Sequence, residues 1–404
     1  MHLLTFFPKR RLRLNLNKTA LLFTFVLFSK PAFAQSSEDS TTSTTLAAFL
    51  NQTHLGGYGE MTYKDPNNGD VPRLNLPRIV LYIDHDFSSK WVFKSEFEVE
   101  DVKIERGVGG EIGFEQAFLD YHANNTIGWR AGLILIPMGI INQTHEPTTF
   151  YSVERPLFDQ QVIPTTWREI GTGIYGNLSE SIEYQLYITE GLIASEISMD
   201  GTDGAKQEGS AGEQTSDAIA GSDASHPAVS GKIEYLPFAG LRLGAAAYMQ
   251  PNAFKTPNTP TDIPGSLFVG AIDARYEHGP LHIRGEAGIV NPGDASNYID
   301  VPDKIEGGYV EAAYNVMPFF TSAPCELLPF VRYESFTFTG PSVIAGDTAT
   351  GLFSTRPTVN HATITAGLAF KPLDGVILKT DYRITKVEGS PIYRQFSLGG
   401  GFAF

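Results

Sequence analysis

Apolar and polar side chains alternate along many short segments of this chain, most clearly over residues 91–100. If this segment is extended, apolar side chains occupy one face and Lys94, Glu96, Glu98 and Glu100 occupy the other. A period of two residues is that of a β-strand, because successive side chains point to opposite faces. The pattern fits a soluble β-sandwich and a membrane barrel equally well, so it predicts strands without deciding between the two.

The lengths of the connections between strands favour the membrane barrel. About sixteen strands are expected, near 54–63, 76–87, 91–100, 112–122, 129–136, 167–178, 182–188, 228–236, 241–249, 267–277, 281–290, 305–316, 328–338, 360–370, 376–387 and 394–404. Every second connection is short and those between them are long or polar, which is the arrangement of outer-membrane barrels. The sequence therefore predicts an all-β fold, a transmembrane antiparallel up-and-down β-barrel over residues 54–404. The turn at 317–327, which carries Cys325, is longer than this rule expects.

The first 34 residues have the order of a secretory signal peptide. A basic region at 9–18 precedes an apolar run at 20–28 and a small-residue cleavage site after Ala34. Residues 35–53, rich in Ser and Thr at their start, are expected to form a flexible leader. No later segment offers about eighteen uninterrupted apolar residues, so no transmembrane helix is expected. These features predict an exported protein of the bacterial outer membrane, surrounded by lipid.

Composition and motifs argue against several classes of function. The formal net charge of −15 disfavours nucleic-acid binding, and one cysteine excludes an intramolecular disulfide framework. The sequence holds no G-x-S-x-G, H-E-x-x-H or phosphate-binding loop motif, so we expect no enzyme, cofactor or metal. A barrel hydrolase with Ser and His on facing strands stays an alternative. His145 with Glu146, followed by Pro147, favours a structural role over a metal or acid–base pair.

The connection at about 137–165, after the fifth predicted strand, is unusually long and has no clear period. Loops of this length without secondary structure are uncommon unless they are functional. Four prolines at or beside it stiffen the chain. We expect the loop to fold into the barrel and narrow it, with a mobile surface loop as the alternative. Its candidate residues for constriction, or for pinning the loop to the barrel wall, are His145, Glu146, Glu154 and Arg155.

Several segments resemble porins of the phosphate-selective porin O and P family. They include 78–82, 97–100, 115–121, 130–133, 142–151, 153–155 and 163–169, and the resemblance is dense over about 76–190. It implies a sixteen-stranded, trimeric, passive channel whose loop after the fifth strand folds inward, with anion selectivity raised as a further implication. Phosphate-selective members use clustered Lys and Arg along the pore. The loop here departs from that pattern, since it contains one Arg and no Lys.

Charged positions opposite the apolar face are expected to point into the lumen. A basic residue at the lipid-facing midplane would cost about 2–4 kcal/mol, which fixes this direction. The predicted lumen charges are Lys94, Glu96, Glu98, Glu100, Arg130, Arg168, Arg275, Arg284, Lys379 and Arg383. They are expected to select among small hydrophilic, including charged, solutes, or else to pair with each other and only hold the wall. Two further alternatives are an anion- or phosphate-selective channel and a plugged structural or adhesive barrel whose loop at 190–227 meets a partner.

Overall fold

The computed structural model describes residues 49–67, 69–100, 111–163, 165–192, 224, 226–253, 265–293, 302–340 and 358–404. The predicted signal peptide, most of the predicted leader and nearly all of the 190–227 segment lie outside the described residues.

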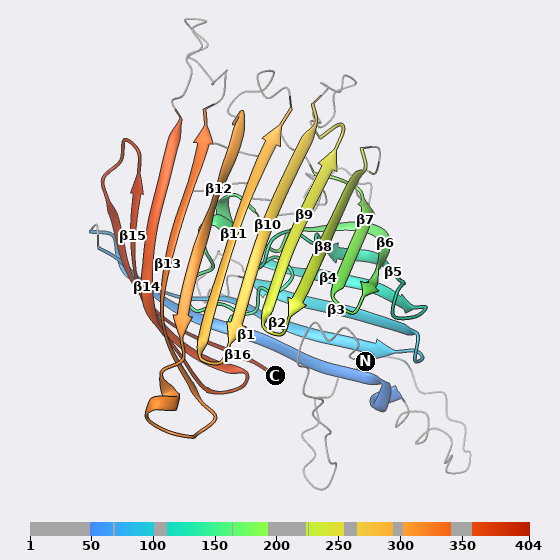
Figure 1. Ribbon diagram of the computed structural model, residues 1–404, viewed down its shortest axis with the longest axis horizontal. Coiled ribbons are helices and arrows are strands. Elements are labelled where there is room, and N and C mark those ends of the chain that lie inside the picture. The colour runs from blue at the N-terminus through green and yellow to red at the C-terminus, as the bar shows by residue number, and fades with distance from the viewer. Residues whose placement is uncertain are drawn as a thin grey trace, which may run out of the picture.

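The predicted fold class is confirmed: sixteen antiparallel strands form one closed barrel in which each strand pairs with its neighbours in sequence and β16 pairs with β1 (Figure 1). The strands are β1 (Thr53–Pro66), β2 (Arg73–Asp86), β3 (Trp91–Glu100), β4 (Glu111–His122), β5 (Gly128–Leu135), β6 (Arg168–Ser179), β7 (Ile182–Thr189), β8 (Ala228–Phe238), β9 (Leu241–Gln250), β10 (Leu267–His278), β11 (Leu281–Pro292), β12 (Lys304–Tyr314), β13 (Glu326–Thr339), β14 (Val359–Leu373), β15 (Val376–Val387) and β16 (Tyr393–Ala403).

The barrel is apolar outside and charged inside. In β13, Val331 and Tyr333 are exposed on the outer surface, whereas Arg332 and Glu334, which alternate with them, are buried inside. Outward apolar side chains recur on the other strands, as with Leu81 in β2. This inversion of the usual soluble pattern requires lipid around the barrel, since water would leave the apolar band unpartnered.

Aromatic side chains gather where β3, β4 and β5 meet short turns. The ring centroid of Trp91 lies 4.6 Å from that of Tyr121 and 6.0 Å from that of Trp129. Such amphipathic rings are enriched at the membrane–water interface. The cluster therefore places one edge of the membrane beside the short-turn end of the barrel.

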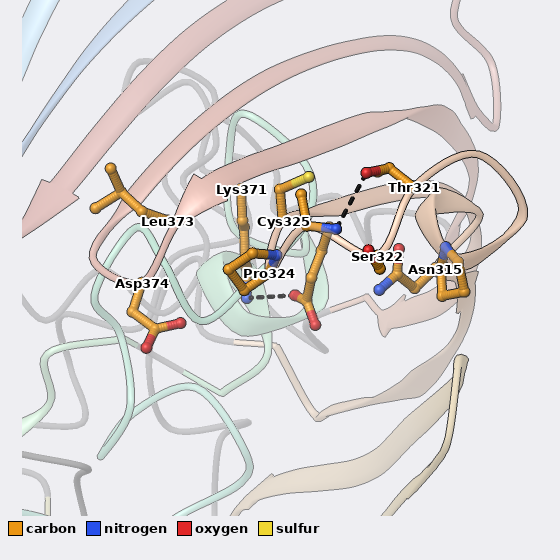
Figure 2. Close-up of a pocket in the computed structure, with 11 residues that line it drawn as sticks. Asn315, Thr321, Ser322, Pro324, Cys325, Lys371, Leu373 and Asp374 are labelled. Carbon is orange, nitrogen blue, oxygen red and sulfur yellow. Dashed lines mark hydrogen bonds and ion pairs between the residues drawn. The ribbon is translucent and has the colours of Figure 1, made fainter.

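The turn between β12 and β13 is the long one anticipated from the sequence. It contains the short 3₁₀ helix η3 (Met317–Phe319) and extends below the other turns in Figure 1. Figure 2 shows Cys325, which is half-buried, next to Lys371 in a hollow at the base of this turn, with Asp374 on the other side of the hollow. Within the described part of the chain, no helix is long and apolar enough to cross a membrane.

Candidate functional site

The connection between β5 and β6 lies inside the barrel. Figure 1 shows it, in green, behind β10 to β12, where it includes the one-turn helix α2 (Phe158–Gln161). We refer to residues 136–167 as the inner loop.

One side of the inner loop forms a hydrophobic core with the barrel wall. The loop contributes Ile136, Met138, Ile140, Ile141, Phe150, Phe158, Val162, Ile163 and Trp167, and the wall contributes Ala228, Ala246, Tyr248, Leu267, Val269, Ala271, Val290, Ile305, Tyr309, Phe336 and Phe338. The rings of Trp167 and Tyr248 have centroids 4.6 Å apart, and those of Phe158 and Tyr309 are 6.0 Å apart. Burial of each large apolar side chain contributes about 1.5–3 kcal/mol, so this core docks the loop firmly.

Carboxylates of the wall accept hydrogen bonds from the loop backbone. The amide of Ile140 donates to Glu286 Oε2 at 2.9 Å, and the amide of Phe158 donates to Glu334 Oε2 at 3.0 Å. The amide of Val153 donates to an Asp381 carboxylate oxygen at 2.6 Å. Hydrogen bonds to a charged acceptor are stronger than neutral ones, so these pairs fix the loop at β11, β13 and β15.

Basic side chains of the wall also contact the inner loop, where they meet backbone carbonyls and an aromatic ring. Lys232 donates to the carbonyl of Gly139 at 2.6 Å, and Arg284 donates to the carbonyl of Thr149 at 2.9 Å. The Lys379 ammonium lies 3.5 Å from the centre of the Phe150 ring. Wall side chains therefore provide hydrogen-bond partners both for backbone N–H groups and for backbone C=O groups of the inner loop, as burial of these groups requires.

The two ends of the inner loop are held together by Asn142. Its Nδ2 donates to the carbonyls of Ile136 and Trp167 at 2.7 and 3.0 Å, and its Oδ1 accepts the Trp167 amide at 2.8 Å. Glu169 then accepts from the Trp167 indole at 2.9 Å and from the Tyr248 hydroxyl at 3.0 Å. These bonds close the loop where it leaves β5 and enters β6.

His145 anchors the loop to the β1–β4 wall. Its Nδ1 lies 3.0 Å from the carbonyl of Asn142, and its Nε2 lies 3.2 Å from Glu115 Oε2. Arg78 donates to the His145 carbonyl at 3.0 Å. Burial lowers the pKa of His145, but the Glu115 carboxylate outweighs burial and raises it to about 9. Glu146, also buried, accepts from the Tyr82 hydroxyl at 3.4 Å.

Glu154 anchors the loop beside β15 and β16. It contacts Arg383 at 3.0 Å and Gln395 at 2.9 Å, and it pairs with Lys64 on β1. Burial raises the pKa of Glu154, but the two cations outweigh burial and hold it at about 2. Arg155 is half-buried and points a guanidinium nitrogen to the His145 carbonyl at 3.4 Å.

A second group of lumen charges stays partly open to water near the short-turn end. The side chains of Arg242 and Arg275 are 28% and 22% exposed, whereas their shared partner Glu234 is 4% exposed. Arg130, at 17%, covers Asp120, at 1%. The guanidinium groups are thus the accessible members of these pairs, and the carboxylates lie behind them.

The predicted lumen charges divide into three outcomes. Arg130 and Arg275 face the lumen and keep some exposure, as does Lys94, whereas Glu98, Arg284, Lys379 and Arg383 face it but are buried. The side chains of Glu96 and Glu100 share the inner face of β3 with Glu98 and are half-buried. The barrel therefore brings most of these residues to one surface, but the inner loop covers part of that surface.

The prediction for Arg168 was wrong. It shares a strand face with Ile170, which is exposed on the outer surface, while Glu169 between them is fully buried inside. The expectation assumed that Trp167 began the strand on the lipid side. Trp167 instead belongs to the inner loop and packs on Tyr248, and the chain reverses at Thr166, where φ is +67°.

Several residues that hold the site were missed from the sequence, chiefly Arg78, Glu115, Lys232, Arg332 and Glu334. Glu115 had a local signal. Apolar residues at 112 and 114 are followed by apolar residues at 117 and 119, and this change of phase marks a β-bulge. The other missed residues lie at inward positions of the same alternating pattern. Their partners lie far away in sequence, so no local pattern indicated that they contact the inner loop.

A closed antiparallel barrel of sixteen strands, apolar outside and charged inside, with its β5–β6 connection folded inward, defines a transmembrane β-barrel with the architecture of porins. The chain belongs to the same family as a protein of Aquifex aeolicus (strain VF5), itself described as uncharacterized, to which it is 30% identical over 346 residues, 81% of this chain and 74% of that one. No family model matches the sequence.

Solved structures share the fold at low sequence identity. Salmonella typhi OmpF, in complex with daunomycin, is 13% identical with a TM-score of 0.56, covering 87% of this chain and 97% of that one. The outer membrane channel DcaP of Acinetobacter baumannii is 14% identical with a TM-score of 0.54 and the same coverage. The trimer form of Vibrio cholerae OmpT is 11% identical with a TM-score of 0.54, covering 87% and 99%.

Proposed function

We propose that this protein is an outer-membrane porin, not an enzyme, through which small hydrophilic solutes diffuse passively past the inner loop. The observation that carries the proposal is a loop fixed across the lumen beside charged side chains that keep contact with water. A loop that is fixed to the barrel wall narrows the pore to a constant width. Rows of charged side chains along a pore discriminate among solutes. The fold shared with the channel DcaP supports the same function.

We further propose a weak preference for anions. Arg242, Arg275 and Arg130 expose more of their side chains than Glu234, Asp273 and Asp120, with which they pair. A passing solute therefore meets guanidinium groups before carboxylates, although the whole chain carries a formal charge of −15. This arrangement supports the relation to the phosphate-selective porin O and P family that the sequence suggested. A homotrimer is part of the proposal, in line with the trimer form of OmpT.

The test is the current through the purified protein in a planar bilayer under a KCl gradient. Low salt is preferred because exposed charges are then least screened. We expect steady open-channel current and a reversal potential of anion-preferring sign, reduced by added phosphate. A cation-preferring sign would overturn the anion preference, and unchanged current in phosphate would remove the phosphate relation.

A second candidate, a plugged structural barrel, is favoured by one observation. The inner loop fills the long-loop half of β8 to β13 with a dry apolar core. If the folded protein carried no current, and if the current did not increase after proteolytic trimming of the surface loops, the porin proposal would be overturned and a plugged barrel would be supported.

A further inference from the structure

A histidine and several carboxylates gather where the inner loop meets β3 and β4. Glu96 on β3, Glu115 on β4 and His145 on the loop each present one ligand atom, and these atoms all lie within 4.8 Å of one another. Three separate chain segments thus converge on one point. The group lies in the wall opposite the apolar core of the loop.

A β-bulge aims Glu115 into this group. In the β3–β4 register Glu96 pairs with Gln116 and Phe97 pairs with Phe114, so Glu115 has no opposite residue. Bulges re-aim side chains, and here Phe114 stays on the outer face while Glu115 is completely buried inside. Without the extra residue, the alternation that runs back from Gln116, which pairs with the inward Glu96, would turn Glu115 to the outer face.

The hydrogen bonds of His145 set its orientation as a ligand. The Asn142 carbonyl, 3.0 Å from Nδ1, can only accept, so Nδ1 carries a proton. The lone pair of a neutral ring then lies on Nε2, which points at Glu115 Oε2 over 3.2 Å. Two acceptors facing each other need a proton or a cation between them. Metal-binding histidines have this same arrangement, with the second nitrogen donating to a backbone carbonyl.

The charge around His145 is unbalanced. Glu98 and Glu146, 3% and 7% exposed, flank the group. Among the residues that the structure describes, one buried oxygen each of Glu96, Glu98, Glu115 and Glu146 has no hydrogen-bond partner. Arg78, which also faces the group, is engaged with Glu60 at 2.9 Å. Buried carboxylates are normally paired or bound to metal, because an isolated buried charge is costly.

We propose that His145 Nε2 and the carboxylates of Glu96 and Glu115 bind a divalent zinc-class cation, with Glu98 and Glu146 supplying further charge and a fourth ligand. One imidazole nitrogen with carboxylate oxygens suits Zn²⁺, whereas Ca²⁺ and Mg²⁺ favour oxygen ligands alone. The ion joins the inner loop to the β3–β4 wall. It therefore fixes the polar side of the loop, as the apolar core fixes the other.

The test uses the full-length purified barrel, treated with a chelator and then titrated with ZnCl₂ at neutral pH. We expect one zinc per chain by calorimetry and by elemental analysis after dialysis. Glu115→Gln and His145→Gln should each weaken binding by at least about ten-fold. Glu286→Gln is the matched control, since Glu286 is another buried lumen carboxylate that holds the loop but lies outside the cluster.

X-ray absorption at the zinc edge tests the wild-type protein without any variant. We expect a first shell of mixed nitrogen and oxygen at about 2.0–2.2 Å. Folded wild type that binds no more zinc than Glu115→Gln would overturn the proposal, and the carboxylates would then be held by shared protons alone. An equal loss of zinc affinity in Glu286→Gln, or a zinc coordination shell without nitrogen, would also overturn the proposal. Zinc binding is measured without any current, so its failure is separate from failure of the porin function.

Discussion

The two sides of the inner loop are held by different forces. Towards β8 to β13 the loop buries a continuous apolar core, whereas towards β1 to β4 it meets ionisable groups around His145. Apolar contact is strong and tolerant of small shifts, while a buried polar network is stable only when every member has a partner. The comparison suggests that one side supplies most of the docking free energy and the other fixes the position of the loop.

The largest effect is expected from opening the apolar side. Phe158→Ala removes a fully buried ring and should destabilise loop docking by about 3–5 kcal/mol. Urea unfolding and the rate of proteolytic cleavage within the loop measure the change, and channel current should become larger and noisier. Phe114→Ala, on the outer face, is the control. If Phe158→Ala matched that control, the apolar core would not be what holds the loop.

A smaller effect is expected where the loop begins and ends. Asn142→Ala removes three buried hydrogen bonds to Ile136 and Trp167 and should cost roughly 1–3 kcal/mol. The same proteolysis assay measures it, with Asn125→Ala in an exposed turn as control. Cleavage as slow as in wild type would show that the loop ends need no such closure.

On the apolar side, raising the pH should loosen the loop. Burial, together with Glu286 and Glu334, raises the pKa of Asp159 above its ordinary value, although Arg284 and Arg332 oppose this. Stability from the protonated form is complete below the unfolded pKa and is lost as pH rises through the folded pKa. Asp159→Asn should therefore flatten the pH profile of unfolding and stabilise the loop at neutral pH. A profile that keeps its slope in the variant would contradict this assignment.

At the β15–β16 contact, lowering the pH should loosen the loop. The pKa of Glu154 falls from 4.5 to about 2, so its contribution is present above pH 4.5 and is lost towards pH 2. Glu154→Gln should remove this acid-side loss and leave the alkaline side unchanged. Opposite pH responses in the two variants would sharpen the contrast between the regions, and parallel responses would break it.

The smallest effect is expected at the partly exposed arginines of the lumen, such as Arg242. Arg242→Gln should move the reversal potential modestly towards cations, because Glu234 and Glu183 lose a shared partner. The shift should shrink in high salt. Lys304→Gln, in an outer ion pair with Glu306, should leave the potential unchanged. An equal shift in both variants would mean that overall charge, not the lumen, sets selectivity.

Alternation along the sequence was sufficient to predict the strands and the inward direction of residues such as Arg275, because a strand has a fixed period. It was not sufficient at Trp167, where an apolar side chain is buried in the lumen instead of facing lipid. It also could not reveal what holds the loop. Ile140 and Glu286 are 146 residues apart and Val153 and Asp381 are 228 apart, and no local pattern links them.

The wall that receives the inner loop is encoded after it. The loop follows β5, whereas its apolar partners come from β8 to β13 and its last polar partners from β15 and β16. During biogenesis the loop therefore leaves β5 with its apolar side chains uncovered, and long-range pairings form slowly. The loop can therefore dock only after the later strands have paired.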